Sequence, residues 1–116
     1  PDGYGSVFNF SGENLTGNIG KLSKVSASSI SVFNSKVYGN IAALSSNLNL
    51  RSLTVALSNV NGSVESLVDA MKTNRNNGTL EIYAIKSDVT YNNKTFSEQS
   101  ISMVIYNFAT SSYTTA

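Results

Sequence analysis

The sequence has no cysteine, no histidine and no tryptophan, and only one proline. Without Cys and His there is no thiol nucleophile, no Ser–His dyad, no imidazole acid–base group near neutral pH and no zinc site built on those ligands. Charge is also scarce, with eight Lys and Arg against seven Asp and Glu, scattered singly along the chain. We therefore expect a protein that is not an enzyme and has no metal or cofactor. Nucleic acid is not an expected partner, because its binding rests on clustered Lys and Arg.

Long hydrophobic runs are missing too. No run is longer than four residues, the length of residues 103–106, which is far shorter than a membrane span, so no span is expected. The chain instead holds 20 Ser, 9 Thr and 15 Asn among its 116 residues, together with a hydrophobic share of 41%. This composition predicts one folded domain over residues 1–116, with a neutral surface rich in hydroxyls and amides.

A repeat organises the first two thirds of the chain. Apolar residues and a Gly recur at offsets 0, 2, 7, 9, 11 and 14, in units that start at residues 8, 30 and 53. The matched positions are Phe8, Phe10, Leu15, Gly17, Ile19 and Leu22; Ile30, Val32, Val37, Gly39, Ile41 and Leu44; and Leu53, Val55, Val60, Gly62, Val64 and Leu67. Weaker strand signals follow near residues 80 and 101. Units of this length predict the coils of a repeat protein.

Each unit has a strand half and a return half. The apolar–polar–apolar triplet at its start is typical of a strand with one buried face, and a helical or 3₁₀ return follows the Gly. The third return, residues 64–71, has one apolar face and Ser63 as its N-cap. We expect at least four parallel strands in one sheet, starting near Phe8, Ile30, Leu53 and Leu80. Their inward residues Phe10, Val32, Val55 and Ile82 should be buried.

Residues 50–60 resemble the leucine-rich-repeat pattern L-x-x-L-x-L-x-x-N-x-L, and residues 15–19, 37–41 and 60–64 resemble its L-x-G-x-I stretch. The Ser- and Asn-rich texture is also similar to repeat proteins of gut bacteria and their phages. The resemblance implies an α/β fold, a right-handed leucine-rich-repeat solenoid with a parallel sheet and short helical or 3₁₀ returns. The ladder Asn of the family is replaced by Glu13, Ser35 and Ser58; Ser can make part of its bond, and Glu13 can face water.

The C-terminal third departs from the repeat. After a polar loop at residues 72–78, residues 89–96 read as a β-hairpin that turns at Asn92 and Asn93, which tolerate positive φ. Because the last coil of a solenoid exposes its core, we expect residues 87–108 to form a cap, with Val89, Tyr91 and Phe96 covering that core. Residues 1–6 are too few and too small to cap the first coil.

The candidate binding site is the outward side of the predicted sheet, which the family resemblance implies is a concave binding surface. Four residues at one offset, Phe33, Ala56, Tyr83 and Val104, should form a strip about 14 Å long across the strands. The polar neighbours expected to surround this strip are Asn9, Ser11, Ser31, Thr54, Glu81 and Ser102. Glu65 and Asp69, four residues apart, are expected to form a solvated helix face with Lys72 rather than a catalytic or metal site.

Two functions remain in competition. The first is a non-enzymatic binding module that contacts a protein or a glycan through this sheet, with self-association through the strip or the solenoid ends as a further option. The second is a structural or assembly segment of a surface, adhesin or phage-tail protein. An open N-terminal coil and an uncharged strand at residues 101–108, expected at an open edge, favour the second. Both functions point to an extracellular, cell-surface or virion-surface location.

Overall fold

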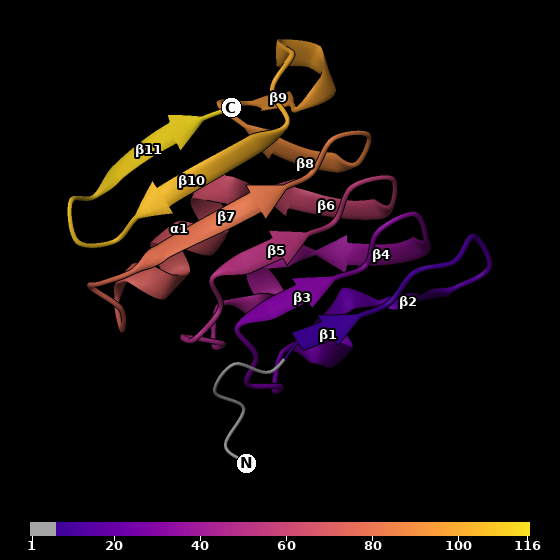
Figure 1. Cartoon of the computed structure of the whole chain (residues 1–116), viewed down its shortest axis with the longest axis horizontal. Helices are drawn as coiled ribbons and strands as arrows, with labels where there is room; N and C mark the ends of the chain where they lie inside the picture. Colours follow the sequence, from indigo (N-terminus) through magenta and orange to yellow (C-terminus); the bar gives the residue numbers. More distant parts are fainter. Residues whose placement is uncertain (1–6) are drawn as a thin grey trace.

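The repeated triplets form the first sheet. In the computed structural model, which describes residues 7–116, β1 (Val7–Asn9), β3 (Ser29–Ser31), β5 (Ser52–Thr54) and β7 (Thr79–Tyr83) are parallel neighbours in that order (Figure 1). The four predicted parallel strands are confirmed. Residues 1–6, and the expectation that they do not cap the first coil, lie outside the described part.

These four strands share one sheet, as expected, and the L-x-G-x-I segments form a second sheet that was not predicted. It contains the parallel strands β2 (Thr16–Asn18), β4 (Lys36–Asn40), β6 (Asn59–Ser63) and β8 (Asp88–Tyr91), with β9 (Lys94–Thr95) antiparallel at its edge. Residues alternate here between exposed and buried, as in Lys36, Val37 and Tyr38. That alternation is the period of a strand with one buried face.

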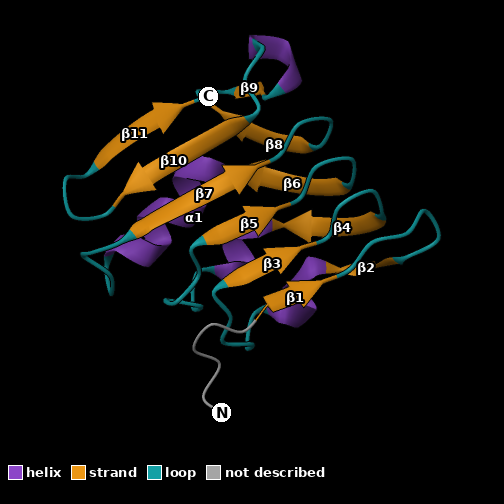
Figure 2. Cartoon of the chain, in the orientation of Figure 1, coloured by secondary structure: helices purple, strands orange, loops and turns teal. Residues whose placement is uncertain are grey.

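The returns after the Gly positions are helical, as expected. Two are 3₁₀ helices, η1 (Ile19–Leu22) and η2 (Ile41–Leu44), and the third is the α-helix α1 (Val64–Lys72). Ser63 is the N-cap of α1, and its Oγ accepts a bond of 3.0 Å from the N–H of Ser66. Figure 2 shows these helices in a column behind the first sheet and beside the second, so the molecule has two layers.

The core lies between the layers. Val32, Val55 and Ile82 are at most 1% exposed, as predicted, together with the inward residues of the second sheet and α1. The prediction for Phe10 is wrong, since its side chain is 37% exposed. Phe10 belongs to the first coil, which has no described coil on its outer side, so the position that buries Val32 and Val55 is open there.

Short polar side chains hold the turns between the sheets. The hydroxyls of Ser35, Ser58 and Ser87 donate to the carbonyls three residues earlier and accept from the amides two residues later. Ser35 and Ser58 were expected to replace the family's ladder Asn in part. Their bonds instead close the turn of their own coil, and Glu13 is exposed as expected.

The C-terminal region combines a confirmed hairpin with a reversed strand. Strands β8 and β9 pair through a turn in which Asn92 and Asn93 have φ of 55° and 68°. Val89 and Phe96 are fully buried and Tyr91 packs against the core, so the residues predicted to cap it do reach it. A short 3₁₀ helix, η3 (Ser97–Gln99), follows the hairpin.

The expected fifth parallel strand near residue 101 is wrong. Strand β10 (Met103–Asn107) runs antiparallel to β7, and β11 (Ser112–Thr115) pairs with its other edge. The uncharged strand β10, which was expected at an open edge of the sheet, is therefore paired on both sides. Strand β9 reverses the direction of β8, so the chain arrives beside the end of β7, where Met103 pairs with Tyr83, and β10 runs back along β7.

Candidate functional site

The outer face of the first sheet is the predicted site, and the register of β7 rearranges it. Leu53 pairs with Ile82, and Thr54 with Tyr83, whereas the repeat spacing had aligned Leu53 with Leu80. A shift of two residues leaves every side chain on the same side of the sheet, so the hydrophobic pattern cannot choose between the two registers. The shift moves Tyr83 out of the strip with Phe33 and Ala56 and into the row of Ser31 and Thr54.

The predicted strip of Phe33, Ala56, Tyr83 and Val104 therefore does not form. Ala56 and Val104 are fully buried. Val104 lies opposite the inward residue Ile82 in the antiparallel ladder, and because opposed residues share a face, Val104 also points inward. Phe33 is 39% exposed and Tyr83 is half-buried, so these two aromatic side chains alone keep their place on the surface.

Two rows of side chains instead cross the outer face. One row follows the pairs from Asn9 through Ser31, Thr54 and Tyr83 to Met103. The other row lies two residues away along each strand. It contains Val7, Ser29, Ser52, Glu81, Ile105 and Thr114. Ser102, expected among the polar neighbours of the strip, precedes β10 and is not in either row. Met103 and Ile105 were not expected on this face, because an uncharged strand gives no sign of which face is buried.

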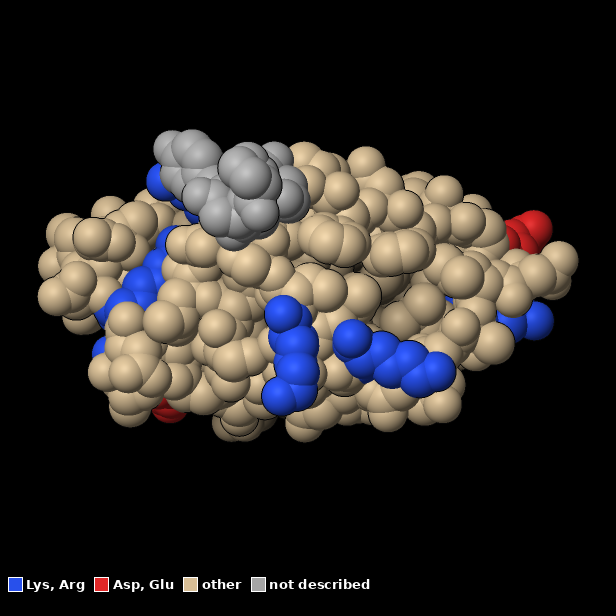
Figure 3. Space-filling model, turned by 90° about the horizontal axis from the view of Figure 1, so that it is seen from below, with Lys and Arg blue, Asp and Glu red and all other residues tan. Residues whose placement is uncertain are grey.

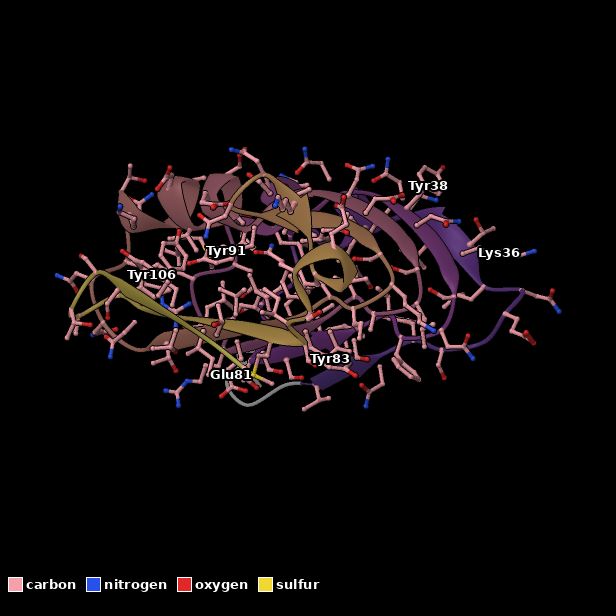
Figure 4. All side chains as sticks on the ribbon, turned by 90° about the horizontal axis from the view of Figure 1, so that it is seen from above. Lys36, Tyr38, Glu81, Tyr83, Tyr91 and Tyr106 are labelled. Atoms are coloured by element: carbon pink, nitrogen blue, oxygen red, sulfur yellow. The ribbon has the colours of Figure 1, made fainter. Side chains whose placement is uncertain are left out.

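The two rows are neutral apart from one carboxylate. Glu81 is the single charged residue in them, and it is exposed. Figure 4 shows Glu81 and Tyr83 on one outer side of the molecule and Tyr38 on the opposite side, with Lys36 at one end and Tyr91 and Tyr106 between the two sides. The face thus offers short hydroxyls and amides beside one phenol ring, with half-buried Met103 and Ile105 at the C-terminal side.

An apolar border continues the face at the turns. The ladder extends beyond the strands through bonds from Asn34 N to Ala56 O (3.1 Å) and from Leu57 N to Ile85 O (3.0 Å). This register places Phe33, Ala56 and Ile85 in one row. Phe33 and Leu57 are 39% and 38% exposed, so the border adds apolar surface close to Tyr83.

A second candidate surface is the N-terminal end of the stack. Phe10, Leu15, Ile19 and Leu22 line a groove of about 190 Å³ there, with Gly17 and Lys21 at its rim. Figure 3 looks at the molecule from this side and shows a surface that is mostly uncharged, with some Lys and Arg and very little acid. The solenoid ends were expected from the sequence as a possible self-association surface, but the residues that line this groove were not identified.

A separate hollow, of about 320 Å³, lies beside Arg75 and Arg51. The Arg75 guanidinium donates to the carbonyls of Leu50 (2.5 Å), Asn77 (3.1 Å) and Thr79 (3.1 Å) and lies 4.4 Å from the Phe108 ring centroid. Burial, with a smaller contribution from the Arg51 charge, lowers the pKa of Arg75 from its ordinary value. Each guanidinium nitrogen already serves a carbonyl, so this arginine anchors the loop before β7.

The acidic residues have structural contacts. Glu65 Oε2 accepts a 2.9 Å bond from the backbone N–H of Asn92, which ties α1 to the hairpin turn. Asp69 lies 3.5 Å from Lys72 Nζ, the exposed pair expected from the sequence. Within residues 7–116, no three Asp, Glu, His or Cys side chains gather where they could hold a metal ion.

None of the described helices has the length and apolar character needed to cross a membrane. Comparison of the chain with protein-family models, with curated proteins and with solved structures finds no match.

Proposed function

We propose that the protein is a non-enzymatic recognition module, built as a right-handed leucine-rich-repeat solenoid, that binds a neutral ligand on the outer face of its first sheet. Support for the solenoid comes from three coils that each contain a strand of the first sheet, a strand of the second sheet and a helical return. The Leu and Gly positions of the family pattern recur in these coils.

One observation carries the functional proposal: a row of hydroxyl and amide side chains leads across four strands to an accessible tyrosine. Asn9, Ser31, Thr54 and Tyr83 are register neighbours, and the exposed ring of Phe33 lies one row further along. Hydroxyls and amides both donate and accept hydrogen bonds, and an aromatic ring offers a flat apolar surface with a polar tip. The combination suits a ligand that has many hydroxyls and apolar ring faces.

The size of the face favours a glycan over a folded protein. Neighbouring strands are about 4.8 Å apart, so the row from Asn9 to Met103 spans roughly 19 Å, and the second row lies about 7 Å from it. A specific protein interface buries on the order of 800 Å² on each partner, several times the area between these rows. A glycan of a few rings matches the dimensions. The neutral face also predicts binding that changes little with salt.

The test is a glycan array and a protein array probed with the purified protein and with a variant that carries both Phe33→Ser and Tyr83→Ser. We expect a glycan signal that the double variant loses at least tenfold. The matched control is Tyr38→Ser, which removes an aromatic ring that is 47% exposed on the opposite sheet and should leave the signal unchanged. Equal binding by the double variant would overturn the proposal, and so would a signal confined to the protein array.

The competing function, an assembly segment, loses its support at residues 101–108, because β11 covers that strand. The remaining support for an assembly function is the open N-terminal end of the stack.

A further inference from the structure

The contact between neighbouring coils follows a template that occurs twice. The Asn that caps one helical return lies against the Gly of the next coil: a Cβ built at Gly39 would lie 2.5 Å from Asn18 Oδ1, and one built at Gly62 would overlap Asn40 Oδ1. The same oxygens accept 2.8 Å bonds from the N–H of Gly20 and Ala42. Each Asn thus ends its own strand and occupies the space that the next coil's Gly leaves.

The first coil has the Gly of this template but not its partner. Gly17 has φ of 142°, comparable to 111° at Gly39 and 99° at Gly62. No atom of the described residues lies within 4 Å of a Cβ built there. A backbone shaped to receive an Asn side chain from an adjacent coil is therefore open at this end.

The apolar residues of the first coil are also more exposed than their counterparts in the later coils. Phe10 is 37% exposed where Val32 and Val55 are at most 1% exposed. Leu22 is half-buried where Leu44 and Leu67 are fully buried. The rings of Phe8 and Phe10 stack with centroids 6.5 Å apart beside the groove. Each of these positions is buried wherever another coil precedes it.

We propose that the N-terminal end of the stack is a docking face for one further repeat coil of the same pattern, in parallel register, whose capping Asn occupies the space over Gly17. The interface is continuous with the two coil–coil contacts already described. It concerns a surface separate from the outer face of the first sheet and does not depend on the ligand proposed there.

A coil of this pattern fits this end better than other occupants. The outer edges of β1 and β2 pair with no described strand, and a coil supplies a parallel partner for both at once, which an isolated extended peptide cannot. A second copy related by a two-fold axis would bring β1 against β1 in antiparallel register. The other end of a second copy has β11 and β9 as its edges, without the Asn-capped return. A mostly uncharged end also suits a neutral coil (Figure 3).

The experiment supplies the coil covalently. A copy of residues 30–52 inserted before Phe8 keeps the repeat period and places a copied Asn40 over Gly17. We expect the extended protein to unfold at a higher denaturant concentration and with a steeper transition, because each added coil buries the exposed end of its neighbour. Hydrogen exchange at the amides of residues 7–10 should slow at least tenfold. No increase in the midpoint and no added protection would overturn the proposal.

Gly17→Ala is the matched test of the register. In the original chain the new methyl meets open space, so only its positive φ opposes it; in the extended chain it also meets the copied Asn40. The substitution should lower the midpoint more in the extended protein, and an equal loss in both would refute the placement of the Asn. Sedimentation of the original protein completes the test: a dimer that Phe10→Ser dissociates would identify a second copy as the occupant and overturn the proposal.

Discussion

Removing the Ser58 hydroxyl should destabilise the protein well beyond the effect of an ordinary surface change. Its Oγ donates to the Val55 carbonyl at 2.5 Å and accepts from the Val60 N–H at 3.3 Å, in a turn where Ser58 is 8% exposed. Ser58→Ala removes about 1 kcal/mol of net hydrogen bonding, and a buried carbonyl left without this partner costs roughly 1–3 kcal/mol instead. We expect a loss of about 2 kcal/mol, which for a domain of this size lowers the Tm by roughly 8 °C.

The assay is urea unfolding followed by far-ultraviolet circular dichroism, with tyrosine fluorescence as the second probe because the chain has no Trp. Ser87→Ala provides an internal replicate, since Ser87 makes the equivalent pair of bonds in the next coil. Ser31→Ala is the control, on the outer face and without a side-chain bond to the turn. The reasoning is refuted if Ser58→Ala and Ser31→Ala are equally stable within about 0.5 kcal/mol.

Three further predictions concern the C-terminal half. Phe96→Ala should cost about 3–5 kcal/mol, because the ring is fully buried at the cap, and a loss below 1 kcal/mol in urea unfolding would contradict its capping role. Arg75→Lys should cost about 2 kcal/mol although it keeps the charge, since a compact ammonium lacks the planar fork of donors that reaches three separate carbonyls beside Phe108; unchanged stability would show that charge alone suffices. Burial foremost, then Glu65 and Asp69, raises the pKa of Tyr113, so the folded state holds this proton longer than the unfolded state. Stability should therefore be retained below pH of about 10 and fall above it, and Tyr113→Phe should reduce that fall in unfolding measurements made across this pH range. An identical pH dependence in the variant would exclude Tyr113 as the cause.

The sequence predicted correctly those strands, caps and turns that depend only on a few neighbouring residues. The triplets at residues 8, 30 and 53 became parallel strands, Ser63 capped α1, and Asn92 and Asn93 formed the hairpin turn. Each of these depends on side-chain periodicity, on one capping hydroxyl or on tolerance of positive φ, all of which are visible in a few consecutive residues.

The candidate site was predicted in its general location but not in its membership. Phe33, Tyr83, Ser31 and Thr54 are on the expected side of the first sheet, whereas Ala56 and Val104 are buried. The error at Val104 came from assuming a parallel fifth strand. The exposure of Phe10 was not predicted because it has the same apolar character as Val32 and Val55, and only the position of a coil in the stack determines whether that residue is covered.

The sequence by itself determined the repeat, its strand and return halves, the absence of His and Cys chemistry and the residues that face inward within each coil. Tertiary structure alone decided the pairing of Leu53 with Ile82, the reversal of β10 and the growth of a second sheet. The physical reason is that side-chain alternation has a period of two residues. It specifies which face of a strand is buried but is unchanged by a two-residue slip, so the partner and register of a strand are selected by loop length and by the packing of whole coils.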